Sequence, residues 1–238
     1  MGKVLFLADI HGNMPALRAL EKEIGRIRPD QLWFVGDAVG KGPEGDQAAD
    51  WVRAHCDRCI QGNWDDGICR EYHSSAFPET GFYVRQLGAE RIAWLESLPF
   101  EDEILISGLL IRVVHGRPTA RLFQAYDTWE EMTEGFTSPK TGKTYDGYIC
   151  ADSHMPYFRA CSHGYAINTG SVGNSLGIPR VHALVLEGDI GGTDKTPLSC
   201  AILSIPYDNT EAARIAEKYP LPNREAYQRE VLTGIYSR

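Results

Sequence analysis

Side chains that bind metal ions occur just past the end of one apolar segment after another. They are carboxylates, imidazoles and one carboxamide: Asp9, His11, Asp37, Asn63, His115, Asp152 and His154. Residues 4–8, for example, lead directly into Asp9, and residues 32–35 lead, after one glycine, into Asp37. Five apolar segments precede these residues. Because open α/β sheets place ligands beyond the carboxyl ends of their strands, we expect the ends of these five segments to converge on one metal site.

This mixture of oxygen and nitrogen donors suits divalent ions, with manganese favoured and iron, zinc, nickel or magnesium as alternatives. Two such ions about 3.5 to 4 Å apart hold the attacking and the leaving oxygen of a phosphate ester during in-line displacement. One carboxylate must then lie between the ions, and Asp37, central in chain order, is the candidate bridge. A hydroxide formed from metal-bound water attacks phosphorus, so no side-chain nucleophile is required.

Each motif alone is a weak indicator. An Asp-x-His pair occurs by chance, and a Gly-Asp pair after a strand is usually a turn. The prediction rests on the whole set, because residue type, chain order and position after an apolar segment agree at all five places. Glycines beside the candidate ligands also let the backbone turn sharply without a Cβ clash. These glycines are Gly12, Gly36, Gly62 and Gly116.

The composition limits the possible partners. The formal net charge of -8 argues against a nucleic-acid-binding face, which needs clustered Lys and Arg, and leaves a small phosphorylated or nucleotide-type substrate open. No apolar run approaches the roughly 20 residues that span a bilayer, so we expect a cytoplasmic protein. The six cysteines are too sparse for a disulfide scaffold and are expected to be reduced. A homo-oligomer remains open.

The first half of the chain alternates apolar and amphipathic segments, the pattern of parallel strands joined by crossover helices. Asn13 is expected to cap a helix that ends near Arg28, and a further helix is expected over residues 82–98. Closely spaced strands follow, beginning with a hairpin across Ser107-Gly108. The pattern predicts an α/β fold of two packed sheets with helices outside, in a single domain over residues 1–238.

The ordered motifs resemble those of the calcineurin-like metallophosphoesterase superfamily. They are Asp9-x-His11, Gly36-Asp37, Gly62-Asn63, Val114-His115-Gly116 and Ser153-His154. Residues 36–44 and 168–173 are similar to its small bacterial and archaeal phosphoesterase branch, and the resemblance extends over residues 3–187. It implies a four-layer αββα sandwich of two mixed sheets flanked by helices, with a dinuclear metal site.

The resemblance also implies how the ligands divide. One ion would be held by Asp9, His11, Asp37 and His154. The other would be held by Asp37, Asn63 and His115. The fifth motif of the family commonly reads Gly-His-x-His, whereas Asp152 stands where an imidazole for the second ion is expected. A carboxylate there still binds Mn, Mg or Fe; the alternative is that Asp152 is too short to reach, which leaves that ion more water.

The third motif departs from the family pattern as well. Much of the superfamily has a histidine, near the leaving group as general acid, where this chain has Trp64. Indole cannot donate a transferable proton, so part of the roughly 10²–10⁴-fold contribution of acid–base assistance is expected to be lost unless another residue substitutes. The candidates are Asp65, Asp66 and His73. The residues predicted to be catalytic are Asp37, Asn63, His115 and Asp65.

These features favour metal-dependent hydrolysis of phosphodiesters or phosphomonoesters, with diesters preferred because of Trp64. One alternative is a serine/threonine-protein or dinucleoside polyphosphate phosphatase, since residues 9–13 also resemble those groups, although their Asp-Arg-Gly is absent after Asp37. The alternative from another class is a catalytically impaired metal- or nucleotide-binding protein. Of the remaining charged residues, Lys41 and Arg180 could approach the mouth of the site, but exposure to solvent is the expectation for each.

Overall fold

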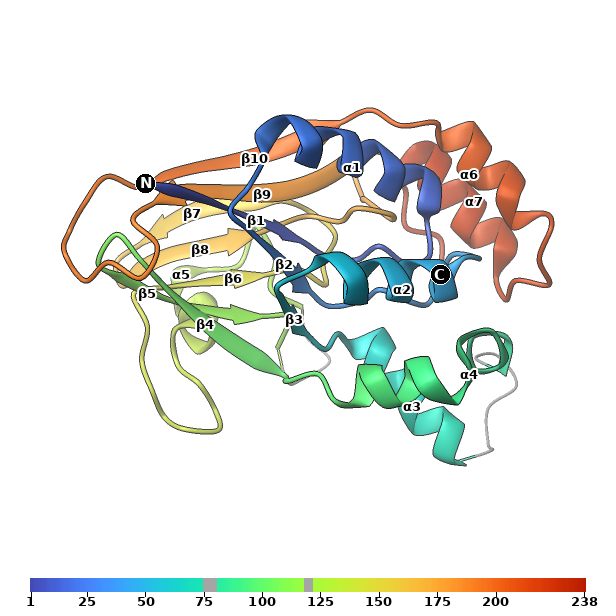
Figure 1. The fold of residues 1–238 in the computed structure, drawn as a ribbon, viewed down its shortest axis with the longest axis horizontal. Helices are drawn as coiled ribbons and strands as arrows, with labels where there is room; N and C mark the ends of the chain where they lie inside the picture. Colours follow the sequence, from blue (N-terminus) through green and yellow to red (C-terminus); the bar gives the residue numbers. More distant parts are fainter. Residues whose placement is uncertain (75–80, 118–121) are drawn as a thin grey trace.

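Two five-stranded sheets pack face to face in the part of the chain that the structure describes, residues 1–74, 81–117 and 122–238 (Figure 1). The structure is a computed structural model. Helices lie on the outside of the sheets, and both sheets mix parallel with antiparallel strands. The predicted α/β fold of two mixed sheets flanked by helices is confirmed.

The first sheet has the strand order β10-β9-β1-β2-β3. Its strands are β1 (Gly2–Leu7), β2 (Gln31–Val35), β3 (Arg58–Ile60), β9 (Val181–Gly188) and β10 (Ser199–Ile205). β1, β2 and β3 are parallel, with Leu7 opposite Phe34 and Val35 opposite Ile60. The carboxyl ends of three strands that precede candidate ligands therefore meet at one edge of this sheet.

The second sheet has the strand order β4-β5-β6-β8-β7. Its strands are β4 (Glu101–Ile106), β5 (Leu109–Val114), β6 (Gly147–Cys150), β7 (Tyr157–Cys161) and β8 (Gly164–Asn168). The predicted hairpin joins β4 to β5 through Ser107 and Gly108, both with positive φ. β5 and β6 are parallel, with Val113 opposite Ile149, so the other two ligand-bearing strands also end side by side.

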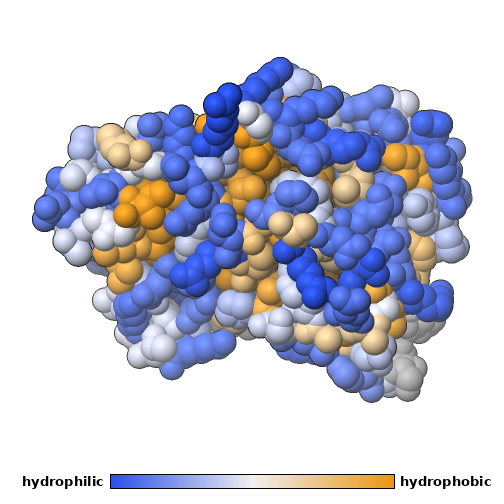
Figure 2. Space-filling view, in the orientation of Figure 1, coloured by the Kyte–Doolittle hydropathy of each residue, from blue (hydrophilic) through white to orange (hydrophobic). Residues whose placement is uncertain are grey.

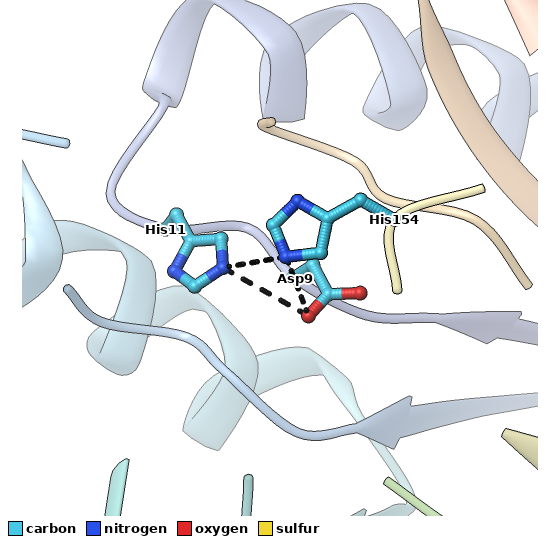
Figure 3. Close-up of side chains that lie close together, drawn as sticks. All are labelled: Asp9, His11 and His154. Carbon is cyan, nitrogen blue, oxygen red and sulfur yellow. Dashed lines mark hydrogen bonds and ion pairs between the residues drawn. The ribbon is translucent and has the colours of Figure 1, made fainter. Parts of the chain in front are cut away.

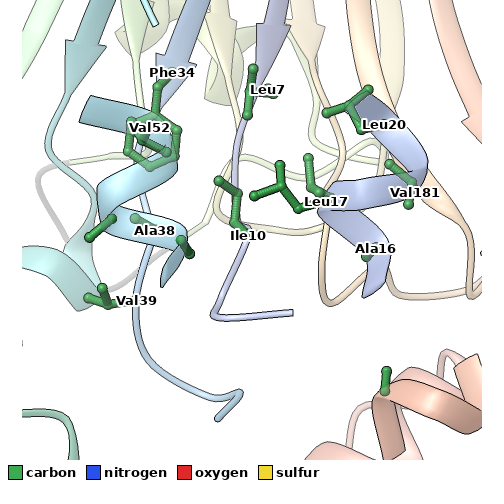
Figure 4. Close-up of a cluster of buried hydrophobic side chains, with 14 of the residues drawn as sticks. Leu7, Ile10, Ala16, Leu17, Leu20, Phe34, Ala38, Val39, Val52 and Val181 are labelled. Atoms are coloured by element: carbon green, nitrogen blue, oxygen red, sulfur yellow. The ribbon is translucent and has the colours of Figure 1, made fainter. Parts of the chain in front are cut away.

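The alternation of side chains along β1 explains how the layers pack. Leu5 and Leu7 belong to a buried cluster with the flanking helices, whereas Val4 and Phe6 belong to a second cluster between the two sheets. Figure 4 shows Leu7 among side chains of the helical layer. A strand with apolar residues on both faces must be covered on both sides, and this requirement produces the central layers of the sandwich.

The helices occupy both outer faces and one end of the molecule. They are α1 (Met14–Ile27), α2 (Gly45–His55), α3 (Asn63–Ser74), α4 (Gly81–Glu96), α5 (Trp129–Met132), α6 (Asn209–Ala216) and α7 (Arg224–Thr233). Asn13 caps α1 by accepting from the backbone N–H of Ala16, and Arg28 ends it in a left-handed conformation, as predicted. The expected helix over residues 82–98 is instead interrupted at Gly88, where φ is 67° and ψ is 170°.

Among the described residues, the outer face of the second sheet carries α5 and a 3-10 turn, Thr133–Phe136, which pack over Tyr148 and Cys150. No helix among the described residues is long and apolar enough to cross a membrane. On the face shown in Figure 2, hydrophilic residues predominate and apolar residues show through in separate groups. The first sheet therefore has the thicker helical cover, and the ligand-bearing loops lie at the carboxyl ends of the parallel strands of both sheets.

Candidate metal centre

All seven candidate ligands lie together at the edge where the ligand-bearing strands of both sheets end. Asp9 and His11 follow β1, Asp37 follows β2, Asn63 begins α3, His115 follows β5, and Asp152 and His154 follow β6. A polar atom of each lies within 3.8 Å of a polar atom of another. The structure thus brings together every residue that the sequence pattern selected as a ligand.

The first ligand group consists of Asp9, His11 and His154, which are buried (Figure 3). Oδ1 of Asp9 lies 3.8 Å from Nε2 of His11 and 3.5 Å from Nε2 of His154. The two Nε2 atoms are 3.2 Å apart. Three donor atoms from two distant loops therefore surround one point.

The second ligand group consists of Asp9, Asp37 and His115. Nε2 of His115 lies 3.4 Å from Oδ2 of Asp37 and 3.8 Å from Oδ1 of Asp9. Oδ2 of Asp37 is also 3.6 Å from Nε2 of His11, so it lies between the two groups. This position suits a bridging carboxylate, and Asp9 is within reach of both groups as well.

Asp152 extends the second group toward solvent. Its Oδ1 lies 3.8 Å from Nε2 of His115 and accepts a hydrogen bond of 3.3 Å from Nδ2 of Asn63. The side chain of Asp152 is therefore long enough to reach the second group. Asn63 is exposed at the rim, and because its Nδ2 faces Asp152, its Oδ1 is left to act as a ligand atom.

The three imidazoles are oriented by backbone carbonyl groups. Nδ1 of His11 lies 3.0 Å from the carbonyl oxygen of Val39, Nδ1 of His115 lies 2.7 Å from that of Val35, and Nδ1 of His154 lies 2.6 Å from that of Asn174. A carbonyl only accepts, so each Nδ1 carries a proton, and Nε2 is the atom that each ring turns toward the centre. This is the tautomer in which imidazole binds a metal through Nε2.

The atoms that face the centre need a cation. In neutral imidazoles held this way, the lone pairs of His11 and His154 face each other across 3.2 Å and repel. Both carboxylate oxygens of Asp9, Oδ2 of Asp37 and Nε2 of His115 are buried without a hydrogen-bond partner. Buried polar atoms are rarely left unpaired, and a divalent ion in each group would satisfy them together. The residues present therefore fit two metal ions.

The backbone is strained where it presents these ligands. Five of the seven have left-handed φ values between 49° and 64°, a region that costs a non-glycine residue about 1–3 kcal/mol. They are Asp9, His11, Asp37, Asp152 and His154. Gly62 lies so close to Asp37 that a Cβ there would clash with Oδ1 of the carboxylate. Such strain persists at sites where the surrounding structure holds the backbone in place, and here it aims the side chains at one centre.

Burial lowers the pKa of His11 and of His154 well below the ordinary histidine value, and the nearby ammonium group of Lys41 acts in the same direction. Both imidazoles are therefore neutral at neutral pH. Neutral imidazole is the form that binds metal.

His115 behaves in the opposite way. Burial opposes its protonation, but the carboxylates of Asp37, Asp9 and Asp152 outweigh burial and raise the pKa of His115 well above its ordinary value. Without a metal, the positive charge of the His115 imidazolium thus balances part of the negative charge of these carboxylates. A divalent ion would supply that positive charge instead.

Metal binding to the second group is expected to release a proton and to strengthen as the pH rises. In the metal-free protein the raised pKa keeps His115 protonated, and Nε2 must lose its proton before it can bind. Below that pKa, protons compete with the ion. Calorimetric titration with manganese in two buffers of different ionisation enthalpy, at about pH 6 and about pH 8, measures both effects. Equal affinity at both pH values without proton release would contradict this expectation.

Comparison with known proteins decides the family. A family model described as calcineurin-like phosphoesterase matches residues 2–196. The chain belongs to this family. The predicted resemblance is confirmed, and the chain has two groups of candidate metal ligands.

The phosphoesterase is similar to several proteins over its whole length. An uncharacterized protein of Methanocaldococcus jannaschii is 22% identical over 240 residues, which cover 92% of this chain and 93% of that protein. A metallophosphoesterase from Sphaerobacter thermophilus is 21% identical with a TM-score of 0.73 and covers 98% of this chain and 99% of its own. A hypothetical protein from Pyrococcus horikoshii is 18% identical with a TM-score of 0.79, and both chains are covered completely. At these identities the solved structures show a shared fold.

Asp65, one of the three candidates to replace the missing general acid, lies beneath the loop that carries Asp37. Asp65 is completely buried, and its oxygens accept from the backbone N–H groups of Asp37 at 2.8 Å, Gly62 at 3.0 Å and Ala38 at 3.1 Å. Burial, together with the charge of Asp37, raises the pKa of Asp65 to about 7. Because both oxygens face backbone donors, the role of proton donor is not supported. Asp65 instead holds the loop that carries Asp37.

The other two candidates for the missing acid lie elsewhere on α3. His73 is paired with Glu96 at 2.6 Å near the end of the helix and lines none of the cavities beside the ligands. Asp66 forms an ion pair of 2.6 Å with Arg70, and both line a cavity of about 420 Å³ beside Asn63. The carboxylate of Asp66 is therefore held by the Arg70 guanidinium on the surface of α3.

Two cations beside the centre were missed by the sequence analysis. Lys41 was expected to be exposed, yet it is only 7% exposed. Together with Arg238 it lines a cavity of about 520 Å³ that opens over Asp37, Asp152 and His154. The position of Lys41 in a glycine-rich run was the only local signal, and the sequence offered none for Arg238.

Proposed function

We propose that this phosphoesterase hydrolyses phosphodiesters or phosphomonoesters with two divalent metal ions. The observation that carries the proposal is the pair of buried ligand groups that share Asp9, with both oxygens of Asp9, Oδ2 of Asp37 and Nε2 of His115 lacking a hydrogen-bond partner. When bound, two such ions supply the Lewis acid and the activated water for in-line attack at phosphorus. The proposed ligands are Asp9, His11, Asp37, Asn63, His115, Asp152 and His154. Manganese is proposed first because oxygen donors predominate around the second group.

Different residues of the centre have different roles in this proposal. Asp37, between the groups, keeps them at a fixed separation, and the backbone hydrogen bond from His11 to the carbonyl of Asp37 ties their loops together at 3.1 Å. Asn63 and Asp152 place polar oxygens at the mouth of the centre, where substrate enters. We also propose a cytoplasmic location and a single domain over residues 1–238.

Diesters are the preferred substrates in this proposal. Trp64 occupies the position of the usual histidine and lines the cavity, but its indole has no transferable proton. Hydrolysis then depends on a leaving group that departs as a stable anion. An activated diester needs less proton transfer than an alkyl monoester does.

With manganese, the purified protein is expected to hydrolyse a bis-aryl phosphate faster than the matching mono-aryl phosphate. Trp64→His is expected to raise the monoester rate relative to the diester rate by about ten-fold or more, since it restores a proton donor. Initial rates on both esters measure this ratio. His154→Ala is the control, because it removes a ligand and should abolish both activities. Turnover of monoesters only would contradict the diester preference.

The candidate from another class is a metal-binding protein that has lost catalysis. The altered third and fifth motifs, Trp64 and Asp152, favour it. Metal analysis of stripped and reloaded protein, combined with a panel of mono- and diesters, separates the two proposals. Two ions per chain without turnover of any ester would favour the binding protein over the enzyme.

A further inference from the structure

Two cations share the wall of the cavity above the metal centre. Lys41 comes from the loop after β2, and Arg238 comes from the segment that follows α7. The Lys41 side chain is buried, and its backbone is left-handed with φ of 54°, which is unusual for lysine. A lysine held out of water in a strained conformation calls for an explanation, because its charge is costly to bury.

A hydrogen-bonded chain holds the two cations in place. Nζ of Lys41 donates to Oδ1 of Asn174 at 3.2 Å, and Nδ2 of Asn174 donates to Oε2 of Glu230 at 3.1 Å. Nε of Arg238 donates to the same Oε2 at 3.3 Å. The backbone carbonyl of Asn174 also accepts from Nδ1 of His154, so the chain is anchored to the first ligand group.

Lys41 and Arg238 have hydrogen-bond donors without an acceptor among the described residues. Nη2 of Arg238 is buried without a partner, and among the described residues the ammonium group of Lys41 donates only to Asn174. The two cations share one buried carboxylate, that of Glu230. Cationic donors that the protein leaves unsatisfied beside a cavity are suited to a phosphate oxygen.

Trp64 contributes to the same wall. The guanidinium carbon of Arg238 lies 5.9 Å from the centroid of the Trp64 ring, within the range of a cation–π contact. The ring packs so closely on Gly40 that a Cβ there would clash with it, and it meets His11 edge-on at a centroid distance of 6.0 Å. The residue that replaces the usual histidine therefore supports a cation beside the metal centre.

We propose that Lys41 and Arg238 form a clamp that binds the phosphate oxygens of the substrate. This inference rests on the proposed function and adds a cationic wall to the metal centre. The clamp supplies positive charge where phosphoryl transfer concentrates negative charge, in a site that lacks the usual histidine. Its ligand class is the phosphate group itself, so inorganic phosphate serves as the probe of the clamp.

The test measures binding of inorganic phosphate to the manganese-loaded protein by calorimetry. Lys41→Met and Arg238→Met are each expected to weaken phosphate binding by about ten-fold or more, because each substitution removes a charge-assisted hydrogen bond. Lys41→Arg is expected to retain most of the affinity. Lys218→Met and Arg229→Met remove exposed charges away from the cavity and should stay within about two-fold of the wild type.

Metal content is measured in every variant. Full metal content with wild-type phosphate affinity in both Lys41→Met and Arg238→Met would overturn the clamp. A loss of phosphate affinity that is explained by a loss of bound metal would overturn it as well. If Lys41→Met does not fold, Arg238→Met carries the same test. Phosphate binding through both residues without hydrolysis of any ester would refute the proposed function and keep the clamp. Ester hydrolysis by the wild type, together with unchanged phosphate affinity in both variants, would refute the clamp and leave the proposed function in place.

Discussion

Asp37→Asn is expected to lower the rate of ester hydrolysis by about 10³-fold or more. Oδ2 of Asp37 lies 3.6 Å from Nε2 of His11 and 3.4 Å from Nε2 of His115, so loss of its charge weakens both ligand groups at once. Asparagine retains an oxygen that can accept the 2.9 Å hydrogen bond from the backbone N–H of Trp64, so the loop is expected to keep its shape. The measurements are kcat/KM and metal ions per chain.

The same variant is expected to be at least as stable as the wild type when both are free of metal. The substitution removes one of several crowded carboxylates, whose repulsion and burial raise the pKa of Asp9 and of Asp152. Manganese should then raise the Tm of the wild type but not that of Asp37→Asn. Asp194→Asn, at an exposed aspartate, is the matched control and should change neither property. Full metal content with wild-type rates in Asp37→Asn would refute the proposed centre.

Asp65→Asn is expected to reduce both stability and activity. The carboxylate accepts backbone N–H groups on both oxygens, whereas the amide must turn its NH₂ toward one pair of those donors. We expect a loss of about 3 kcal/mol in the free energy of unfolding. Activity should fall by about 10- to 100-fold, because the loop that presents Asp37 is no longer held.

Chemical denaturation and steady-state kinetics separate this positioning role from acid catalysis. A proton donor would lose kcat without losing stability, so an unchanged free energy of unfolding would contradict the positioning role. Asp66→Asn is the neighbouring control. Its ion pair with Arg70 lies at the surface, so the free energy of unfolding should change by no more than about 0.5 kcal/mol.

The strand-end pattern was sufficient to predict the fold and the set of candidate ligands. Alternating apolar segments predicted parallel strands, and the carboxyl ends of parallel strands meet at one edge, so Asp9 and Asp37 had to approach one another. His115 follows a strand of the other sheet and reaches them because the two sheets pack face to face. The helix over residues 82–98 was predicted less well. Its apolar spacing continues past Gly88, but that glycine adopts a backbone conformation that interrupts the helix.

The roles of polar residues next to the ligands were harder to predict. Asp65 and Asp66 are adjacent and identical in type, yet one is buried under four backbone donors and the other forms a surface ion pair. The direction of each side chain depends on how α3 packs against the loop after β2. No spacing within the sequence contains that information.

The sequence by itself determined which residues could bind metal and which strands would carry them, because residue type and the period of two along a strand are local properties. Only the tertiary structure decided that Asp152 reaches the second group, that Asp65 faces the backbone, and that Lys41 is buried. Lys41 is joined to Asn174 across 133 residues of the sequence and Asn174 to Glu230 across 56, whereas Glu230 and Arg238 are only 8 residues apart. Such contacts arise when α7 and its following segment pack beside the ligand loops, and burial then sets the charge around the metal centre.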